Sequence, residues 1–364
     1  MTATNYTQSP KFFLGANTPN GFVSRFDNLY YPEESWFAYI IKGGPGTGKS
    51  TLMKRLAKEA NLKNVKTELI YCSSDPSSLD AVIFPELKVS IADGTSPHTL
   101  DPVFPGVSDT IINLCDCWDK SKLKNLNNDI IKLSKKNSSF HKKSKKYLSA
   151  YEQIDNDICD LIYSYYDKDK IINYANKLSQ KYFKKFSSKP GKENIRFISG
   201  ITPKGIIFFE ETLNILSDKT IIIDDEYGIV GNIILSIIKE NAANSGFDLF
   251  SCYCPTKPKT KLESIIIPEL NISFAVSNSY HNINELENIQ VVHSKRFLNT
   301  SSEEFKKYRI SFDYKLKREL IDESVLNLEK AKSTHDDLEK LYSSCMDYNK
   351  VNHITEKLIN DILK

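Results

Sequence analysis

The pattern of apolar and polar positions predicts a strand, a glycine-rich turn and a helix near the start of the chain. Phe37–Ile41 is a short apolar run, as expected of a buried parallel strand. Eight residues, Gly43–Ser50, then separate it from a stretch in which Leu52, Leu56 and Ala60 recur at helical spacing. Strand, glycine loop and helix in this order are typical of an α/β fold.

Two later stretches have the pattern of long helices. Between Asp119 and about Phe186 there is no Pro or Gly, and the apolar residues that recur at helical spacing are Leu123, Leu126, Ile130, Leu133, Ile154, Ile158, Leu161 and Tyr165. Apolar residues recur at helical spacing again from Glu303 to the C-terminus. Such stripes are typical of helix–helix seams. We expect two long antiparallel helices in the first stretch, joined near the basic segment His141–Lys146. That segment favours a solvated face, with nucleic-acid binding as the alternative.

The chain also repeats itself at an almost constant offset. Thr18-Pro-x-Gly21 matches Thr202-Pro-x-Gly205, and Pro85-Glu-Leu87 matches Pro268-Glu-Leu270. His98 falls in register with His281, and Cys72 corresponds to Cys252. Ordered matches of this kind indicate a tandem duplication.

We therefore predict an α/β fold with two related lobes in tandem, each with a parallel sheet and a long helical hairpin. The expected divisions are a first lobe at 1–118, a helical hairpin arm at 119–190, a second lobe at 191–300 and a C-terminal helical arm at 301–364.

The loop between the first strand and helix is a complete phosphate-binding motif. It reads Gly43, Gly44, Pro45, Gly46, Thr47, Gly48, Lys49, Ser50, followed by Thr51. Glycines let successive backbone N–H groups point at phosphate oxygens, and the helix that follows places its positive end against the anion. Lys49 is expected to reach the β- and γ-phosphates, and the Ser50 hydroxyl to hold Mg²⁺.

The second copy has lost this motif. Aligning the strands places Asp224–Asn232 over the loop, with Gly228 over Gly46, Gly231 over Lys49 and Asn232 over Ser50. Acidic residues here repel a triphosphate, so this loop is expected not to bind nucleotide. In a second interpretation, Thr220–Glu226 is a Walker B strand in which Asp225 supports Mg²⁺ and Glu226 polarises water. That interpretation requires these acids to lie near Lys49.

A nucleotide hydrolase also needs an acid at the end of a strand to support the metal. In the first copy the candidate is Asp93, after the alternating Val89 and Ile91. Its counterpart is Val276, so the acid and the lysine are lost together. Asp75 is a secondary candidate for metal or substrate contact, because it follows the strand that ends at Cys72. His98 could contact phosphate, but its partner His281 persists in the degenerate copy, which favours a structural role.

The overall composition limits which other classes of protein this chain could belong to. The chain has 364 residues, 40% of them hydrophobic, and a net charge of +3, too small to argue for nucleic acid by itself. Its N-terminus lacks the layout of a signal peptide and no apolar run approaches a membrane span, so the expected location is the cytoplasm. The seven cysteines include C-x-C pairs, which favour reduced thiols over a zinc site.

Together the motifs resemble a little-characterised family of bacterial P-loop ATPases built from two related halves. The residues that carry the resemblance are Thr18–Gly21, Gly43–Thr51, Cys72–Asp75, Pro85–Leu87 and Asp93–His98. The resemblance implies ATP binding and no particular substrate. In such relatives the second half can keep a phosphate loop, which this sequence does not. Over the loop alone, the sequence also resembles nucleoside-monophosphate kinases.

Both lobes are thus expected to be P-loop NTPase-like, with an active lobe at 1–118 and a degenerate lobe at 191–300. The sequence predicts an ATP-binding protein with Mg²⁺ as cofactor, in which slow hydrolysis drives movement of the helical arms. Lys49 and Asp93 are the expected catalytic residues, and Ser50 and Asp93 the expected metal ligands. The alternatives are a small-molecule or nucleotide kinase and a non-hydrolysing ATP-binding scaffold. A protein partner could bind the arms, and the silent half could supply a residue in trans. Arg196 and Arg296 are both available as an arginine finger.

Overall fold

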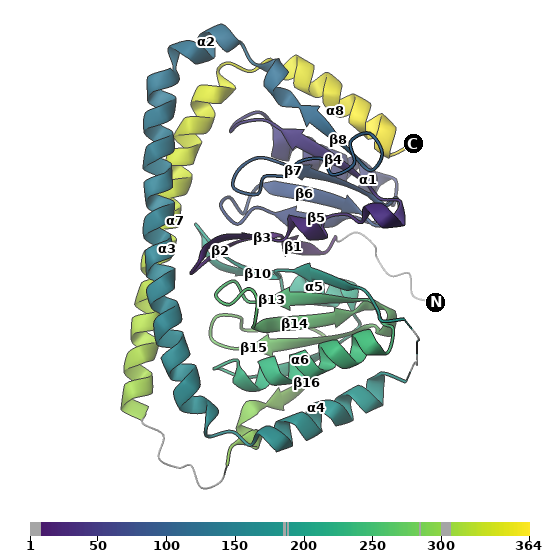
Figure 1. Ribbon diagram of the computed structural model, residues 1–364, viewed down its shortest axis with the longest axis vertical. Helices are drawn as coiled ribbons and strands as arrows, with labels where there is room; N and C mark the ends of the chain where they lie inside the picture. Colours follow the sequence, from purple (N-terminus) through teal and green to yellow (C-terminus); the bar gives the residue numbers. More distant parts are fainter. Residues whose placement is uncertain (1–8, 185–186, 188, 284, 300–306) are drawn as a thin grey trace.

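The structure is a computed structural model that describes residues 9–184, 187, 189–283, 285–299 and 307–364. It is an α/β protein with two tandem lobes, each built on a six-stranded sheet, and a pair of long helices along one side of both lobes (Figure 1). No helix in these residues is long and apolar enough to cross a membrane.

The two sheets have the same strand order. The first sheet runs β1 (Lys11–Phe13), β5 (Glu68–Tyr71), β6 (Leu79–Phe84), β7 (Val89–Asp93), β4 (Phe37–Lys42) and β8 (Asp109–Asn113). The second runs β9 (Glu193–Arg196), β13 (Leu249–Tyr253), β14 (Leu262–Ile267), β15 (Ile272–Ser277), β12 (Lys219–Asp224) and β16 (Ile289–His293). Short 3₁₀ helices are η1 (Phe26–Asn28), η2 (Pro32–Glu34), η3 (Leu114–Cys117), η4 (Pro268–Leu270) and η5 (Ser294–Phe297).

The prediction of parallel sheets is wrong for one strand in each lobe. β6 is antiparallel to both of its neighbours, and so is its counterpart β14. Each is joined to the next strand by a tight turn, between Phe84 and Val89 or between Ile267 and Ile272, and so short a connection permits only an antiparallel neighbour. Both strands are buried along their whole length, so they resemble parallel core strands in sequence.

In each lobe the first strand is followed by a small hairpin that explains the repeated Thr-Pro-x-Gly motif. The hairpins are β2 (Gly15–Thr18) with β3 (Gly21–Ser24), and β10 (Ser199–Thr202) with β11 (Gly205–Phe208). The Thr18 hydroxyl donates to the Gly21 carbonyl at 2.6 Å, and Thr202 bonds Gly205 in the same way at 2.8 Å. Both glycines have positive φ, 107° and 95°, which explains the residue type.

The helices also occur in equivalent pairs. α1 (Lys49–Leu62) and α6 (Ile229–Asn244) follow the central strands. α3 (Asn127–Tyr163) and α7 (Lys307–Ser343) are the long arms, and α4 (Lys168–Tyr182) and α8 (Tyr348–Ile362) follow them. The short helices are α2 (Lys120–Asn125) and α5 (Glu211–Leu216). The end of α7 and both bounds of α8 equal those of α3 and α4 plus 180, so the two arms correspond at a constant offset.

A pseudo-twofold axis relates the two halves. Phe13 and Phe197, equivalent residues, exchange backbone hydrogen bonds of 2.8 and 2.9 Å where the lobes meet. Along the arms, the hydroxyls of the equivalent residues Ser144 and Ser324 lie 2.8 Å apart and are buried. A contact between equivalent residues is expected on such an axis, so these two pairs locate it.

The predicted hairpin within each arm is wrong. α3 continues unbroken through His141–Lys146, and the chain bends only at residues 164–167, where the Asp167 side chain caps α4. The antiparallel partner of α3 is α7 from the other half (Figure 1). The absence of Pro and Gly lets the helix continue, and the apolar stripe is covered by the equivalent stripe of the second copy.

Each arm ends in a helix that packs on the lobe of the other half of the chain, so the two halves exchange these helices. α4, in the first half of the chain, packs on α6 of the second lobe, and α8 returns to pack on α1 of the first lobe. Leu358, Ile362 and Leu363 join the core beneath α1, beside Leu52 and Leu56. Burial of each such side chain contributes about 1.5–3 kcal/mol, so each lobe depends on the arm of the other half for its stability.

Candidate functional site

The glycine loop lies between β4 and α1 and has the conformation that its sequence predicts. Gly46 and Gly48 have positive φ values of 66° and 85°, which favour glycine. A Cβ atom on Gly43 would lie only 2.6 Å from the hydroxyl of Thr47, which itself donates to the Gly44 carbonyl at 2.9 Å. The loop therefore needs glycine at all three positions.

The backbone of this loop presents donors with no protein acceptor. Within the described chain, none of the amide N–H groups from Gly44 to Thr51 donates a hydrogen bond to another residue, and the first such bond runs from Leu52 to the Gly48 carbonyl. These amides lie at the N-terminal end of a 14-residue helix. Free amides together with the positive end of a helix form a site for an anion.

Lys49 and Asp93, which the sequence predicts as one site, lie together. The Lys49 ammonium is 3.5 Å from Asp93 Oδ2 and donates to the carbonyls of Gly43 and Gly44 at 2.8 Å each. β7 is the direct parallel neighbour of β4, and Asp93 pairs with Ile41 in that register. Thr95 fixes the carboxylate by donating to Oδ1 from its amide at 2.9 Å and its hydroxyl at 2.6 Å.

Ser50 and Asp93 provide oxygen atoms of the kind that Mg²⁺ prefers. The Ser50 hydroxyl oxygen accepts the Leu79 amide at 2.9 Å, which orients the side chain and leaves further lone-pair capacity on the oxygen. Hydroxyl and carboxylate oxygens form a donor set that suits a hard divalent cation. These two residues would hold the ion between the end of β7 and the start of α1.

The end of the second arm lies against the loop, a contact that sequence reasoning missed. The carbonyl of Gly46 accepts hydrogen bonds from Tyr348 at 2.8 Å and from Ser343 at 3.2 Å. A Cβ atom on Gly46 would lie 2.6 Å from the Glu339 carbonyl oxygen. Nearly 300 residues separate these groups in sequence, and no local pattern could have joined them.

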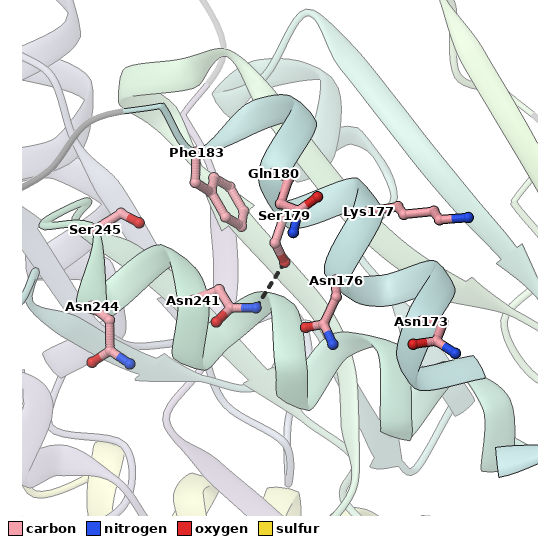
Figure 2. Close-up of a pocket in the computed structure, with 9 residues that line it drawn as sticks. All are labelled: Asn173, Asn176, Lys177, Ser179, Gln180, Phe183, Asn241, Asn244 and Ser245. Carbon is pink, nitrogen blue, oxygen red and sulfur yellow. Dashed lines mark hydrogen bonds between the residues drawn. The ribbon is translucent and has the colours of Figure 1, made fainter. Parts of the chain in front are cut away.

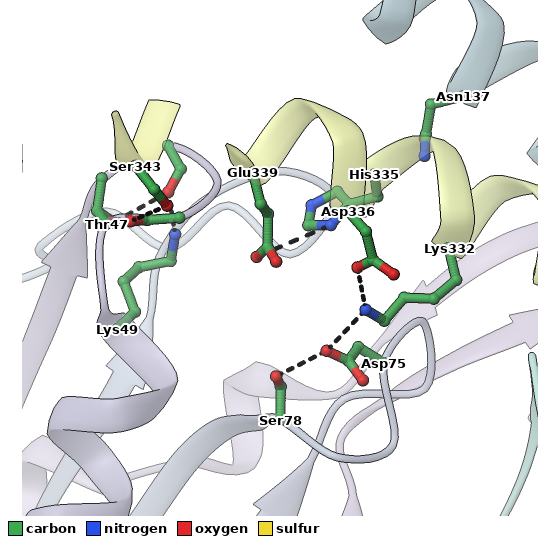
Figure 3. Close-up of polar contacts among 12 residues, drawn as sticks. Thr47, Lys49, Asp75, Ser78, Asn137, Lys332, His335, Asp336, Glu339 and Ser343 are labelled. Atoms are coloured by element: carbon green, nitrogen blue, oxygen red, sulfur yellow. Dashed lines mark hydrogen bonds and ion pairs between the residues drawn. The ribbon is translucent and has the colours of Figure 1, made fainter. Parts of the chain in front are cut away.

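Beyond Ser343, α7 directs polar side chains toward the same region. Figure 3 shows His335 and Glu339 on the helix face above the loop, with Lys332 reaching down to Asp75. The His335 ring and the Glu339 carboxylate are 3.9 Å apart, and the ammonium of Lys332 lies 3.4 Å from Asp75. The spacing of four residues between His335 and Glu339 was the available sequence signal.

Asp75, the secondary candidate, is held by neighbours rather than free for chemistry. The Ser77 and Ser78 hydroxyls donate to it at 2.6 and 2.8 Å. Although burial opposes ionisation, these bonds and Lys332 lower the pKa of the Asp75 carboxyl. It therefore links the β5–β6 turn to α7 as a carboxylate.

His98 lies in the interior. Its Nε2 is 3.3 Å from Asp80, and its ring stacks on Phe26 with centroids 4.5 Å apart. The equivalent His281 lies 3.5 Å from Glu263, at the position that corresponds to Asp80. The pairing of both histidines with a buried acid supports the structural role that the repeat predicts.

The loop of the second lobe contains a carboxylate where the first has free amides. Asp225 is fully buried, and its Oδ2 accepts the Gly231 amide at 2.8 Å. Burial raises the pKa of this carboxyl, while the amides of Gly231, Tyr227 and Gly228 oppose the shift. Gly231 is the counterpart of Lys49, so a side chain of the protein occupies the anion position.

Two contacts confirm this alignment and decide between the two sequence interpretations. Asn232 accepts the Leu262 amide at 2.9 Å, as Ser50 accepts that of Leu79, and Gly228 has a φ of 68° against 66° for Gly46. β12 belongs to the second sheet, at the position of β4. Its acids contact residues of the second lobe, so the Walker B interpretation, which needs them beside Lys49, is wrong.

The arm over the second lobe is fixed by buried ion pairs. Asp155, the counterpart of His335, lies 2.7 Å from Lys257 and 2.5 Å from Lys317, and the side chains of Asp155 and Lys317 are only 4% and 5% exposed. At the first lobe, Lys332 of α7 contacts Asp75 in the corresponding turn, and these side chains are 23% and 19% exposed, against 16% and 4% for Lys257 and Asp155. The ion pair between arm and lobe is therefore more accessible to solvent at the first lobe than at the second.

A separate groove of about 600 Å³ lies between α4 and α6, on the second lobe (Figure 2). Its walls are largely amides, including Asn176 and Asn244, and the Asn241 side chain donates to Ser179 at 2.9 Å. The groove is formed by the exchanged arm and lies on the lobe that lacks the glycine loop.

Comparisons with family models, with curated proteins and with solved structures found no match.

Proposed function

We propose that this protein binds ATP with Mg²⁺ at the loop Gly43–Thr51 and hydrolyses it slowly, and that the second arm responds to the nucleotide. The observation that carries the proposal is a loop whose amide N–H groups have no acceptor among the described residues of the protein. Beside it, the Lys49 ammonium lies 3.5 Å from the Asp93 carboxylate. A lysine, a strand-end acid and a glycine loop in this order are the parts that phosphoryl transfer requires.

Each part has a role in the proposed reaction. The amides and the N-terminus of α1 bind the phosphate chain, and the Lys49 ammonium exchanges its bonds to the Gly43 and Gly44 carbonyls for bonds to phosphate oxygens. Ser50 and Asp93 hold Mg²⁺, which neutralises charge on the phosphates. Lys49 then stabilises the charge that develops as the terminal phosphoryl group leaves.

The state of two neighbouring groups supports the proposal that turnover is slow. Asp75 is engaged by two serine hydroxyls and Lys332, and His98 is buried against Asp80. Neither of these groups is available to orient a water molecule for attack.

The contacts of the second arm support the response to nucleotide. Ser343 and Tyr348 both donate to the Gly46 carbonyl, inside the segment that would surround the phosphates. A change in the backbone of this loop therefore changes the contacts that hold the end of α7 and the start of α8. Coupling of this kind needs two arrangements of one element, which the proposal assigns to the arm.

The test is ATP binding and phosphate release by wild type, Lys49→Ala and Lys58→Ala in the presence of Mg²⁺. Lys58 is an exposed lysine on the same helix and serves as the matched control. A lost charge-assisted bond costs about 1.5–3 kcal/mol, so Lys49→Ala should bind ATP roughly ten- to a hundredfold more weakly. Wild type that does not bind ATP would overturn the proposal.

The same assay separates the alternatives for the reaction. Phosphate release that is absent without an added acceptor would indicate a kinase. A rise in melting temperature with ATP, without phosphate release under any condition, would indicate a binding scaffold.

A further inference from the structure

The positive charge of the chain is concentrated on the first arm. Residues 119–150 contain ten lysines and two aspartates, a net charge of +8, whereas the whole chain has +3. The remainder of the protein is therefore net negative, at −5. All ten lysines are exposed: Lys120, Lys122, Lys124, Lys132, Lys135, Lys136, Lys142, Lys143, Lys145 and Lys146.

The lysines of α3 form one stripe on its solvent face. At about 100° per residue, the seven between Lys132 and Lys146 fall within roughly half of the helix circumference. The buried Ser144 and Leu148, which face α7, lie on the opposite side. Over these 14 steps of about 1.5 Å each, the stripe is roughly 21 Å long, and α2 extends it with three more lysines. We call these ten residues the lysine stripe.

The stripe has few counter-charges within the protein. Among the described residues, only Lys122 has a carboxylate within ion-pair distance, that of Asp119 at 3.7 Å. On α3, Asp129 is the one acid before Glu152. Figure 1 shows this half of α3 on the outer edge of the molecule, with α7 between it and the first lobe. Apart from Lys122, the lysines of the stripe therefore face solvent without an ion-pair partner among the described residues.

The equivalent positions on the second arm show whether the fold needs lysines there to keep this helix face solvated. The counterparts of the seven α3 lysines, 180 residues later, are Phe312, Lys315, Leu316, Asp322, Glu323, Val325 and Leu326. They lie at the same positions of an equivalent helix on the outer edge of the same fold. Only one is a lysine and two are acids, so the fold does not need a lysine stripe to solvate this face.

We propose that the lysine stripe binds the phosphodiester backbone of a nucleic acid. A linear array of ammonium groups matches a linear array of phosphates, and lysine acts there as a point charge without reading sequence. Binding then releases counterions from the polyanion, so affinity falls steeply with salt and depends little on base sequence. This activity is independent of ATP binding at the loop.

The experiment measures binding of the full chain to a fluorescent duplex DNA of about two helical turns and to a single-stranded RNA of the same mixed sequence. Fluorescence anisotropy is followed between about 50 and 200 mM salt. The test variant replaces Lys132, Lys136, Lys143 and Lys146 with Gln, which retains helix propensity. The control variant makes the same charge change at the dispersed, exposed residues Lys58, Lys177, Lys259 and Lys357.

Wild type should bind at least one of the two nucleic acids. The stripe variant should bind at least tenfold more weakly, and the salt slope should fall by about 0.9 for each lysine that contacts phosphate on duplex DNA. The control should keep most of the affinity, and both variants should keep the melting temperature of wild type. Equal losses in the two variants would overturn the proposal, as would no binding by wild type, or binding to anionic lipid vesicles without binding to nucleic acid.

Discussion

The Tyr348 hydroxyl donates a hydrogen bond of 2.8 Å to the carbonyl oxygen of Gly46. Tyr348 begins the last helix of the second half, and Gly46 lies in the glycine loop of the first. Ser343 donates to the same oxygen at 3.2 Å. Two donors from one arm therefore meet on a single carbonyl, and they link the candidate nucleotide site directly to the other half of the chain.

Gly46→Ala should weaken this link. The residue has a positive φ, which costs about 1–2 kcal/mol for alanine, and its Cβ would lie 2.6 Å from the Glu339 carbonyl oxygen, which adds about 1–3 kcal/mol of overpacking. Gly106→Ala is the control, because Gly106 has a φ of 78° with nothing within 4 Å. Thermal unfolding should show a larger loss for Gly46→Ala; equal losses would mean that the arm contact adds nothing.

Asp93→Asn should raise the Mg²⁺ requirement of ATP hydrolysis. The substitution keeps the shape of the side chain and removes the charge beside Lys49, so the Mg²⁺ concentration at half-maximal phosphate release should rise by about 10- to 100-fold. Asp101→Asn, which removes an exposed carboxylate paired with Lys42, is the control. An unchanged Mg²⁺ dependence in Asp93→Asn would remove Asp93 from the metal site.

Isothermal titration should give one ATP per chain. The anion position in the second loop is taken by the Asp225 carboxylate, and Gly231 stands where the first loop has Lys49. Lys49→Ala should therefore weaken all of the ATP binding roughly ten- to a hundredfold, rather than leave half of the sites unchanged. A second site that survives in Lys49→Ala and disappears when Asp225 is changed would show that the second loop also binds.

The two buried histidines should affect stability in opposite pH ranges. Burial opposes the charge on His98, but Asp80 and Asp93 outweigh it and raise its pKa, so the stability it contributes is present below about pH 6.5 and is lost as pH rises through its folded pKa. Burial lowers the pKa of His281, although Glu263 opposes the shift, so its contribution is present above about pH 6.5 and is lost as pH falls through its folded pKa.

Denaturant unfolding of His98→Gln and His281→Gln over about pH 5–8 checks this contrast. The difference in unfolding free energy between wild type and His98→Gln should shrink as pH rises. The difference for His281→Gln should shrink as pH falls. Parallel curves for the two variants would contradict the assignment of opposite shifts.

Much of the fold follows from local pattern. The loop Gly43–Ser50, the strand end at Asp93 and the counterpart Val276 were placed from residue spacing alone, because glycine turns and apolar runs act over a few residues. The exchange of α4 and α8 between lobes could not be placed this way. The two arms have similar apolar stripes, and either lobe would bury them equally well by composition.

The loop of the second lobe, Asp224–Asn232, was also predicted only in part. Sequence alignment identified the missing lysine at Gly231, but acids in the loop predicted only repulsion of phosphate. The structure shows that Asp225 is turned inward and bonded to the Gly231 amide. Whether an acid points out or in depends on the length of the turn and the burial around it, which residue type alone does not specify.

The exchange of arms also determines how this chain can be divided. A cut between residues 190 and 191 separates the two copies in sequence, but it leaves α8 on the wrong fragment for the first lobe and α4 on the wrong fragment for the second. Neither fragment is a complete structural unit, whereas the two together regenerate every interface. The chain is thus equivalent to an interlocked dimer joined end to end, which cannot dissociate on dilution and in which one subunit is free to diverge while the other keeps its loop.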